Sequence, residues 1–171
     1  KDYRGLRPLR IAALRVGERE IVALMGIDAL AAEVLVNLLT GATLPDEGEV
    51  RVFGESTRDI ADGDAWLARL DRFGILSDRA VLLEELSVAQ NLAVPLTLDL
   101  GSLAGEVAAA VRRLADEVTL DPATLDTPVR RATRESRLRV RLARAVALDP
   151  RVIVTEHATA TLPRASVASF A

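Results

Sequence analysis

The clearest pattern along the chain is an alternation of short apolar runs with longer segments of helical character. Continuous apolar runs at residues 21–25, 73–76 and 152–154 are typical of strands buried in a parallel sheet. Residues 29–40 favour a helix, and Gly41 follows it, as glycine commonly follows a helix C-terminus. This alternation predicts an α/β fold.

The first half of the chain carries additional, weaker signals. Apolar residues recur with a period near two over residues 1–16, which predicts an N-terminal antiparallel hairpin at the edge of a sheet. Turn-forming residues at 44–48 precede an alternating segment at 49–53 that predicts another strand. We expect a polar loop over 55–63 and a short helix over 65–70.

The middle of the chain is predicted to be helical. Residues 81–86 and 88–92 lack strand signals, and the clearest helix spans 106–118, with its apolar residues on one face. An arginine-rich helix follows at about 136–148. We therefore expect a single domain over residues 1–171, with an α/β core at 1–78 and 136–171 and a helical subdomain at 79–135.

The amino-acid composition argues against several classes of function. With 22 basic and 25 acidic residues the net charge is −3, and the five aromatic residues are too few for a stacking platform, so we expect no nucleic-acid binding. No cysteine and a single histidine leave little for a metal site. No apolar run approaches the ~20 residues of a membrane span. We expect a cytoplasmic domain, with peripheral attachment to the inner face of the membrane as one option.

The junction between the apolar run 21–25 and the helix 29–40 has the layout of a phosphate-binding loop. Such loops read G-x-x-x-x-G-K-[ST], with glycines for close backbone approach, a lysine for the terminal phosphates and a hydroxyl for Mg²⁺. Counted from Gly26, the second glycine is Ala31, the lysine is Ala32 and the hydroxyl is Glu33, with Val34 next.

Two acidic residues lie in this segment, which lacks the lysine and the hydroxyl of a phosphate-binding loop. Asp28 is expected to cap the helix, and Glu33 is expected near the first helical turn, where the helix dipole favours its charge. A phosphate would meet two negative charges there, and close like charges cost about 1–4 kcal/mol at partly exposed sites. The loop is interpreted as an ordinary capped turn from strand to helix.

Four stretches, taken in order along the chain, carry a resemblance to a known family: GEREIVALMG at 17–26, NLLTGATLPDEGEVRVFG at 37–54, LSVAQNLAVPL at 86–96 and RVRLARAVALDPRVIV at 139–154. The chain resembles the nucleotide-binding domain of ATP-binding cassette (ABC) transporters over nearly its whole length, especially the subfamilies that serve lipid or lipoprotein transport. The resemblance implies a P-loop NTPase-like core with N-terminal antiparallel strands and a helical insertion, truncated at its C-terminus.

The resemblance assigns family positions to individual residues. Tyr3 stands where the family stacks an aromatic ring on adenine, although a partly buried anchor is an equal alternative. Asp78 stands at the glutamine that couples the Mg²⁺ site to the membrane partner. Glu156 takes the place of the family's magnesium-binding aspartate, and His157 that of its general base. Pro163 replaces a following aspartate that contacts the partner subunit.

The signature that closes on ATP in the opposite subunit is also changed. It is Leu-Ser-Gly-Gly-Gln in the family and Ala132-Thr133-Arg134-Glu135-Ser136 here. Both glycines are lost, and side chains in their place would block the close backbone approach to a γ-phosphate. The segment is interpreted as a helix start.

The resemblance therefore implies a degenerate ABC subunit. We expect no catalytic residue and no cofactor or metal, and a structural or regulatory partnership with a transmembrane permease or an active ABC ATPase. One alternative is a weak ATPase that binds ATP and Mg²⁺ through Tyr3, the loop amides, Glu156 and His157. The other is a regulatory domain that holds a cation between Asp28, Glu33 and Glu156.

Overall fold

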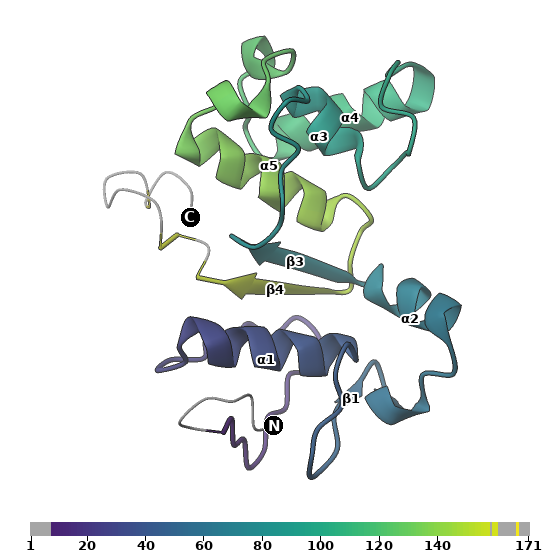
Figure 1. Ribbon diagram of the computed structural model, residues 1–171, viewed down its shortest axis with the longest axis vertical. Helices are drawn as coiled ribbons and strands as arrows, with labels where there is room; N and C mark the ends of the chain where they lie inside the picture. The colour runs from purple at the N-terminus through teal and green to yellow at the C-terminus, as the bar shows by residue number, and fades with distance from the viewer. Residues whose placement is uncertain (1–7, 158, 161–166, 168–171) are drawn as a thin grey trace. The chain divides into compact units, whose positions relative to one another are not determined.

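The computed structural model describes residues 8–157, 159–160 and 167 (Figure 1). It divides into two compact units, residues 1–70 and 71–171, which are described separately. Both units combine helices with short strands, which agrees with the predicted α/β class. The predicted division into a core and a helical subdomain at 79–135 is a different partition and stays a prediction.

The first unit contains the predicted helix, α1, at Ala29–Thr40. The helix ends where predicted, because Gly41 adopts a left-handed conformation (φ 76°) and its N–H donates to the carbonyl of Leu38. A side chain at this position would also be crowded, since a Cβ on Gly41 would lie 2.6 Å from Cδ1 of Ile60.

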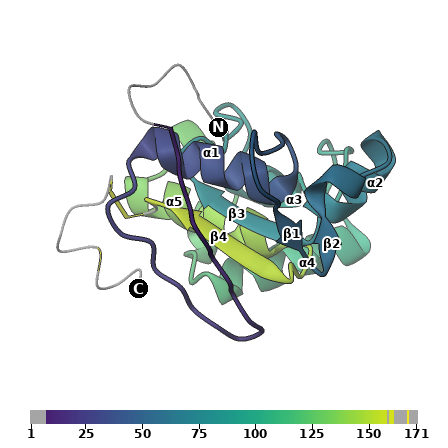
Figure 2. The same ribbon diagram turned by 90° about the horizontal axis from the view of Figure 1, so that it is seen from below.

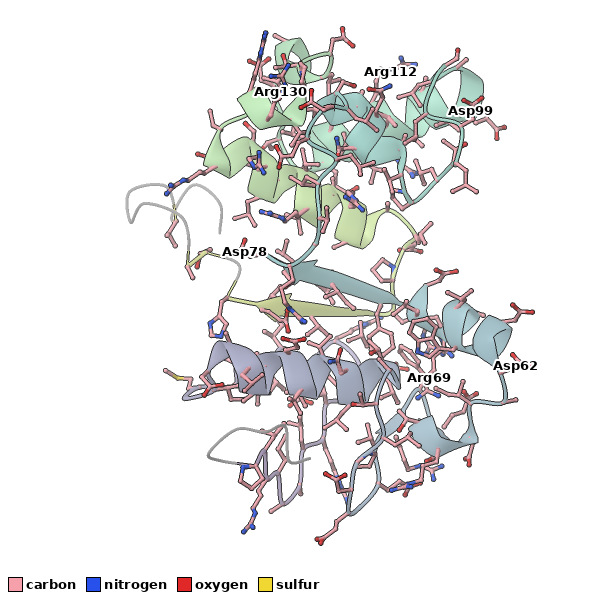
Figure 3. The ribbon with its side chains drawn as sticks, in the orientation of Figure 1. Asp62, Arg69, Asp78, Asp99, Arg112 and Arg130 are labelled. Carbon is pink, nitrogen blue, oxygen red and sulfur yellow. The ribbon has the colours of Figure 1, made fainter. Side chains whose placement is uncertain are left out.

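A two-stranded antiparallel hairpin and a second helix complete the first unit. In chain order these elements are β1 (Arg51–Val52), β2 (Glu55–Ser56), the 3₁₀-helix η1 (Thr57–Asp59) and α2 (Gly63–Leu70). Arg69 on α2 ties the helix to the hairpin (Figure 3), because its Nη2 donates to the carbonyls of Val52 at 3.1 Å and Glu55 at 3.2 Å. The predicted loop over 55–63 is therefore wrong at its start, which forms β2 and η1.

Two predicted N-terminal elements, a hairpin and a strand, are absent from the described part of the first unit. Residues 8–28 contain no strand, so neither the hairpin over 1–16, of which residues 1–7 lie outside the described part, nor the strand at 21–25 is found. The apolar run is exposed, with Ile21 97% and Met25 91% accessible. Apolar character alone does not make a strand, because a strand also needs a partner for its backbone hydrogen bonds.

The second unit is organised around two parallel strands, β3 (Phe73–Ser77) and β4 (Val152–Glu156). Their register runs from Phe73 opposite Val152 to Ser77 opposite Glu156, so both strands end at the same edge (Figure 2). The strands predicted at 73–76 and 152–154 are confirmed and slightly longer. β4 is only half buried, because Ile153 is 52% exposed.

Three helices lie together on one side of these strands (Figure 1): α3 (Val88–Ala93), α4 (Gly105–Glu117) and α5 (Arg134–Val146), with the 3₁₀-helices η2 (Pro122–Thr124) and η3 (Val129–Arg131) between α4 and α5. Their shared core is aliphatic and includes Val88, Leu92, Leu114, Val129 and Val140. α5 packs on β3, where Leu138 and Leu76 form a second buried cluster. Residues 81–86 are not helical, which corrects the prediction for that segment.

Candidate functional site

The N-terminus of α1 is capped by the chain itself. Asp28 has extended backbone geometry, and its Oδ1 accepts a hydrogen bond from the N–H of Ala31 at 2.8 Å. The N–H of Ala32 donates to the main-chain carbonyl of Asp28 at 2.9 Å. Gly26 turns the chain before the helix with φ 76°, a conformation that glycine adopts without strain. The predicted capped turn is therefore present.

Glu33 lies further along the helix than the sequence suggested. It is preceded by four helical residues, so it stands beyond the first turn, where the dipole effect has already declined. Ala31, Ala32 and Glu33 are half-buried, and Val34 is buried at 3% exposure. Asp28 is the acidic residue whose side chain caps this helix end.

Asp78 and Glu156 lie at the same edge of the second unit, because β3 ends at Ser77 and β4 at Glu156, which are paired. Figure 3 shows Asp78 just beyond β3. Its Oδ1 lies 3.4 Å from Nη1 of Arg141 on α5. This carboxylate therefore faces a guanidinium rather than open solvent alone.

Glu156 is held by a residue that the sequence analysis did not single out. Nη2 of Arg79 lies 2.8 Å from both carboxylate oxygens of Glu156, and its Nε lies 3.3 Å from Oε2. The Glu156 side chain is only 7% exposed, whereas that of Arg79 is 47% exposed. A buried carboxylate is costly unless it is paired, and this guanidinium pairs both of its oxygens.

His157 follows Glu156 directly but lies in a different environment. Its side chain is exposed, and its backbone is left-handed with φ 45°, where histidine is found more often than most residues. The carbonyl of His157 accepts from the N–H of Ala160 at 2.9 Å, which turns the chain away from β4.

The loop that follows β3, residues 78–86, is fixed to α5 by a row of arginines. Arg141 Nε donates to the carbonyl of Ala80 at 3.0 Å, and Arg144 Nη1 donates to that of Val81 at 2.7 Å. Arg137 forms an ion pair with Glu84, with Nη1 2.8 Å from Oε2. Positions 137, 141 and 144 lie on one helix face, a spacing that was available in the sequence as a signal.

These contacts and the burial of α5 shift the pKa of three side chains, Glu84, Arg137 and Arg144. The hydrogen bond from Arg137 lowers the pKa of Glu84 below its usual value, and the same contact raises the pKa of Arg137. Burial lowers the pKa of Arg144, and the nearby Arg141 charge adds to this effect. All three groups are charged at neutral pH.

The signature position forms the beginning of α5. Thr133 is its N-cap, and its Oγ1 accepts from the N–H of Ser136 at 3.1 Å. The two hydroxyl oxygens lie 2.9 Å apart. Glu135 pairs with Arg139 one turn later at 2.9 Å, while Arg134 begins the helix and Ala132 is the C-cap of η3. The predicted helix start is therefore present, and its free N–H groups are partly satisfied by Thr133.

Some predicted residues are not tested by this geometry. Tyr3 and Pro163 lie outside the described residues. Asp28 and Glu33 belong to the first unit and Glu156 to the second, so their predicted convergence stays a prediction. Within the described part of either unit, no three His, Cys, Asp or Glu side chains are grouped to hold a metal ion.

A surface cavity of about 400 Å³ lies elsewhere in the first unit. It is lined by Arg51, Gly54, Glu55, Asp59 and Arg69, among others, none of which is a predicted site residue. Its lining is partly paired internally, because Arg69 forms an ion pair with Glu55. None of the described helices has the length and apolar character required to cross a membrane.

Comparison with known proteins identifies relatives with similar sequences. The family model for ABC transporters matches residues 9–160. The ribose import ATP-binding protein RbsA of Burkholderia mallei is 33% identical over 98% of this chain, which covers 33% of RbsA. The lipoprotein-releasing system ATP-binding protein LolD of Chromohalobacter salexigens is 31% identical over 87% of this chain, which covers 61% of LolD. The chain thus spans about a third of RbsA and three fifths of LolD.

Solved structures support the same fold. The dimeric ABC transporter cassette MJ0796 matches 92% of this chain and 68% of its own, with a TM-score of 0.76 and 23% sequence identity. A bacterial Atm1-family ABC exporter with ATP bound matches 84% of this chain with a TM-score of 0.60 and 21% identity. Together with the family match, these findings show that the chain belongs to the ABC transporter family and corresponds to its nucleotide-binding domain.

Proposed function

We propose that this chain is a non-hydrolysing member of the ABC family that serves as a structural or regulatory partner of a transmembrane permease or of an active ABC ATPase. The observation that carries the proposal is the N-terminus of α1. The Asp28 side chain accepts from the N–H of Ala31 there, and the lysine and hydroxyl positions hold Ala32 and Glu33. A phosphate would have to displace a carboxylate and would find no cation in its place.

The remaining family positions support the same proposal. A magnesium nucleotide needs oxygen ligands that are free to face the metal, yet both oxygens of Glu156 accept from Arg79. The signature segment has side chains where glycines would allow close approach, and Thr133 caps the helix there. Phosphoryl transfer depends on positioning and charge stabilisation of the phosphates, and these residues supply little of either.

The 78–86 loop presents an apolar surface that suits the docking of a partner protein. The 78–86 loop is fixed by Arg137, Arg141 and Arg144, and it exposes apolar side chains, with Val81 73% and Leu83 41% accessible. A rigid backbone with exposed apolar residues suits a docking site, because little conformational entropy is lost on binding. We propose that a transmembrane permease docks here, with the domain at the inner face of the membrane. The transport roles in the relatives' names agree with this setting.

The proposal is tested by co-purification with a transmembrane permease and with an active ABC ATPase from the same organism. We expect a stoichiometric complex with the unmodified chain, and at least a tenfold loss of affinity for Val81→Asp, because a carboxylate would enter an apolar contact. Leu98→Asp is the matched control, since Leu98 is fully exposed on a different loop. Two results would contradict the proposal. One is a chain that binds neither the permease nor the ABC ATPase, and the other is an equal loss of affinity for Val81→Asp and Leu98→Asp.

A further inference from the structure

The ion pair between Arg79 and Glu156 has a distinct position in the second unit. Glu156 ends β4, and Arg79 lies two residues beyond the end of β3, so the pair joins the loop after one strand to the end of its neighbour. Three nitrogen–oxygen contacts between 2.8 and 3.3 Å link the two side chains. The pair therefore links the two strands at the edge of the sheet where both have their carboxyl ends.

The environment of Glu156 requires a positive partner. Its side chain is buried to 93%, and an unpaired carboxylate at that depth would be strongly unfavourable. The resemblance implies a divalent cation at this position, but the donor set does not fit one, since a guanidinium already contacts both carboxylate oxygens and the neighbouring Asp78 faces Arg141. A divalent cation and a guanidinium cannot occupy the same side of one carboxylate.

We infer that Arg79 is a built-in counter-cation, which takes the place of a divalent metal at Glu156 and fixes the start of the 78–86 loop. The inference rests on the proposed function, because a chain that needs no magnesium nucleotide is free to replace the metal by a side chain. The loop is then held at its start by Arg79 and further along by Arg141, Arg144 and Arg137. Its position would not depend on nucleotide or metal.

The test measures the melting temperature of the full chain with and without 10 mM MgCl₂ or CaCl₂, in the absence of nucleotide. The unmodified chain is expected to show no shift with either cation. Arg79→Ala is expected to melt about 5 °C lower, because it leaves the carboxylate of Glu156 buried and unpaired. Either cation should restore about half of that loss, since oxygen ligands released from the guanidinium can then bind a hard cation.

Three further variants make the test specific. Arg79→Ala with Glu156→Gln should lose the cation response, because the neutral amide no longer attracts a cation. Arg79→Lys should fold with intermediate stability, which covers the case that Arg79→Ala does not fold. Arg130→Ala is the control, since Arg130 pairs with Glu85 in an exposed ion pair of the same unit and its loss should change the melting temperature by less than 2 °C.

Two results would overturn the inference. One is a magnesium-dependent shift in the unmodified chain that disappears on Glu156→Gln, which would show that the metal competes successfully with Arg79. The other is an Arg79→Ala variant that is as stable as the unmodified chain and indifferent to both cations. Neither result depends on ATP. A wrong assignment of Arg79 is therefore distinguishable from a wrong proposed function, because the latter would appear as binding of a nucleotide.

Discussion

Replacing Gly74 by alanine is expected to lower the free energy of unfolding of the second unit by about 3 kcal/mol. A Cβ at this position of β3 would lie 2.4 Å from the main-chain oxygen of Ala145 and 3.0 Å from Cγ of Pro150. The first contact is with backbone, so a side-chain rotation cannot relieve it. Either β3 or α5 must move away from the other.

The measurement is denaturant unfolding followed by circular dichroism. Gly63→Ala is the matched control, because Gly63 begins α2, its φ is not positive and nothing lies within 4 Å of an added Cβ. That variant should be neutral or up to about 0.5 kcal/mol more stable, since alanine is the better helix former. Equal stability of the Gly74 and Gly63 variants would show that β3 and α5 are not in such close contact.

Replacing Asn91 by aspartate is expected to cost about 3 kcal/mol at neutral pH. Asn91 is fully buried at the centre of α3, where its Oδ1 accepts from the N–H of Leu83 at 2.8 Å. Its Nδ2 donates to the carbonyls of Leu83 and Ser87, each at 3.0 Å, and more weakly to that of Leu86. A carboxylate would keep the first contact but would direct its second oxygen at carbonyl oxygens, with a buried unpaired charge.

This change should loosen the 78–86 loop as well as the core, because Asn91 binds the loop backbone at Leu83 and Leu86. Hydrogen exchange of the loop amides, measured alongside denaturant unfolding, reports both effects. Gln90→Glu is the matched control: Gln90 is half-buried, its Oε1 accepts from Ser87 N–H, and only the donation from Nε2 to Leu100 is lost. We expect a loss of at most about 1.5 kcal/mol there. An equal loss for both variants would contradict the role of Asn91.

The sequence predicted the helices of this chain better than its strands. The helix at residues 29–40 carries its own signals, a capping aspartate at its start and a glycine after its end, and both act as predicted. The strand expected at 21–25 had only apolar character in its favour, and the described structure leaves Ile21 exposed there. Strand pairing depends on a distant partner, which a local pattern does not identify.

The contacts of the candidate site were not predicted from the sequence. The resemblance assigned family positions to Glu156 and Asp78, and the structure has Glu156 at the end of β4 and Asp78 directly after β3. It gave no indication that Arg79 would pair with Glu156, because the two residues are separated by 77 positions and meet only through the parallel register of β3 and β4. The arginine row on α5 was visible as composition, but Arg141 and Arg144 donate to main-chain carbonyls, which leave no trace in a sequence.

The most direct test of the central claim is a titration of the full chain with MgATP up to 5 mM, followed by calorimetry and by thermal unfolding, with MgCl₂ alone as the control. We expect no binding heat and no rise in melting temperature beyond the control. A ligand at 100 times its Kd stabilises a protein by about 2.7 kcal/mol, so a Kd of about 50 μM would be plainly visible. Saturable binding in that range would contradict the proposed non-hydrolysing role and would show that the chain is a working nucleotide-binding domain.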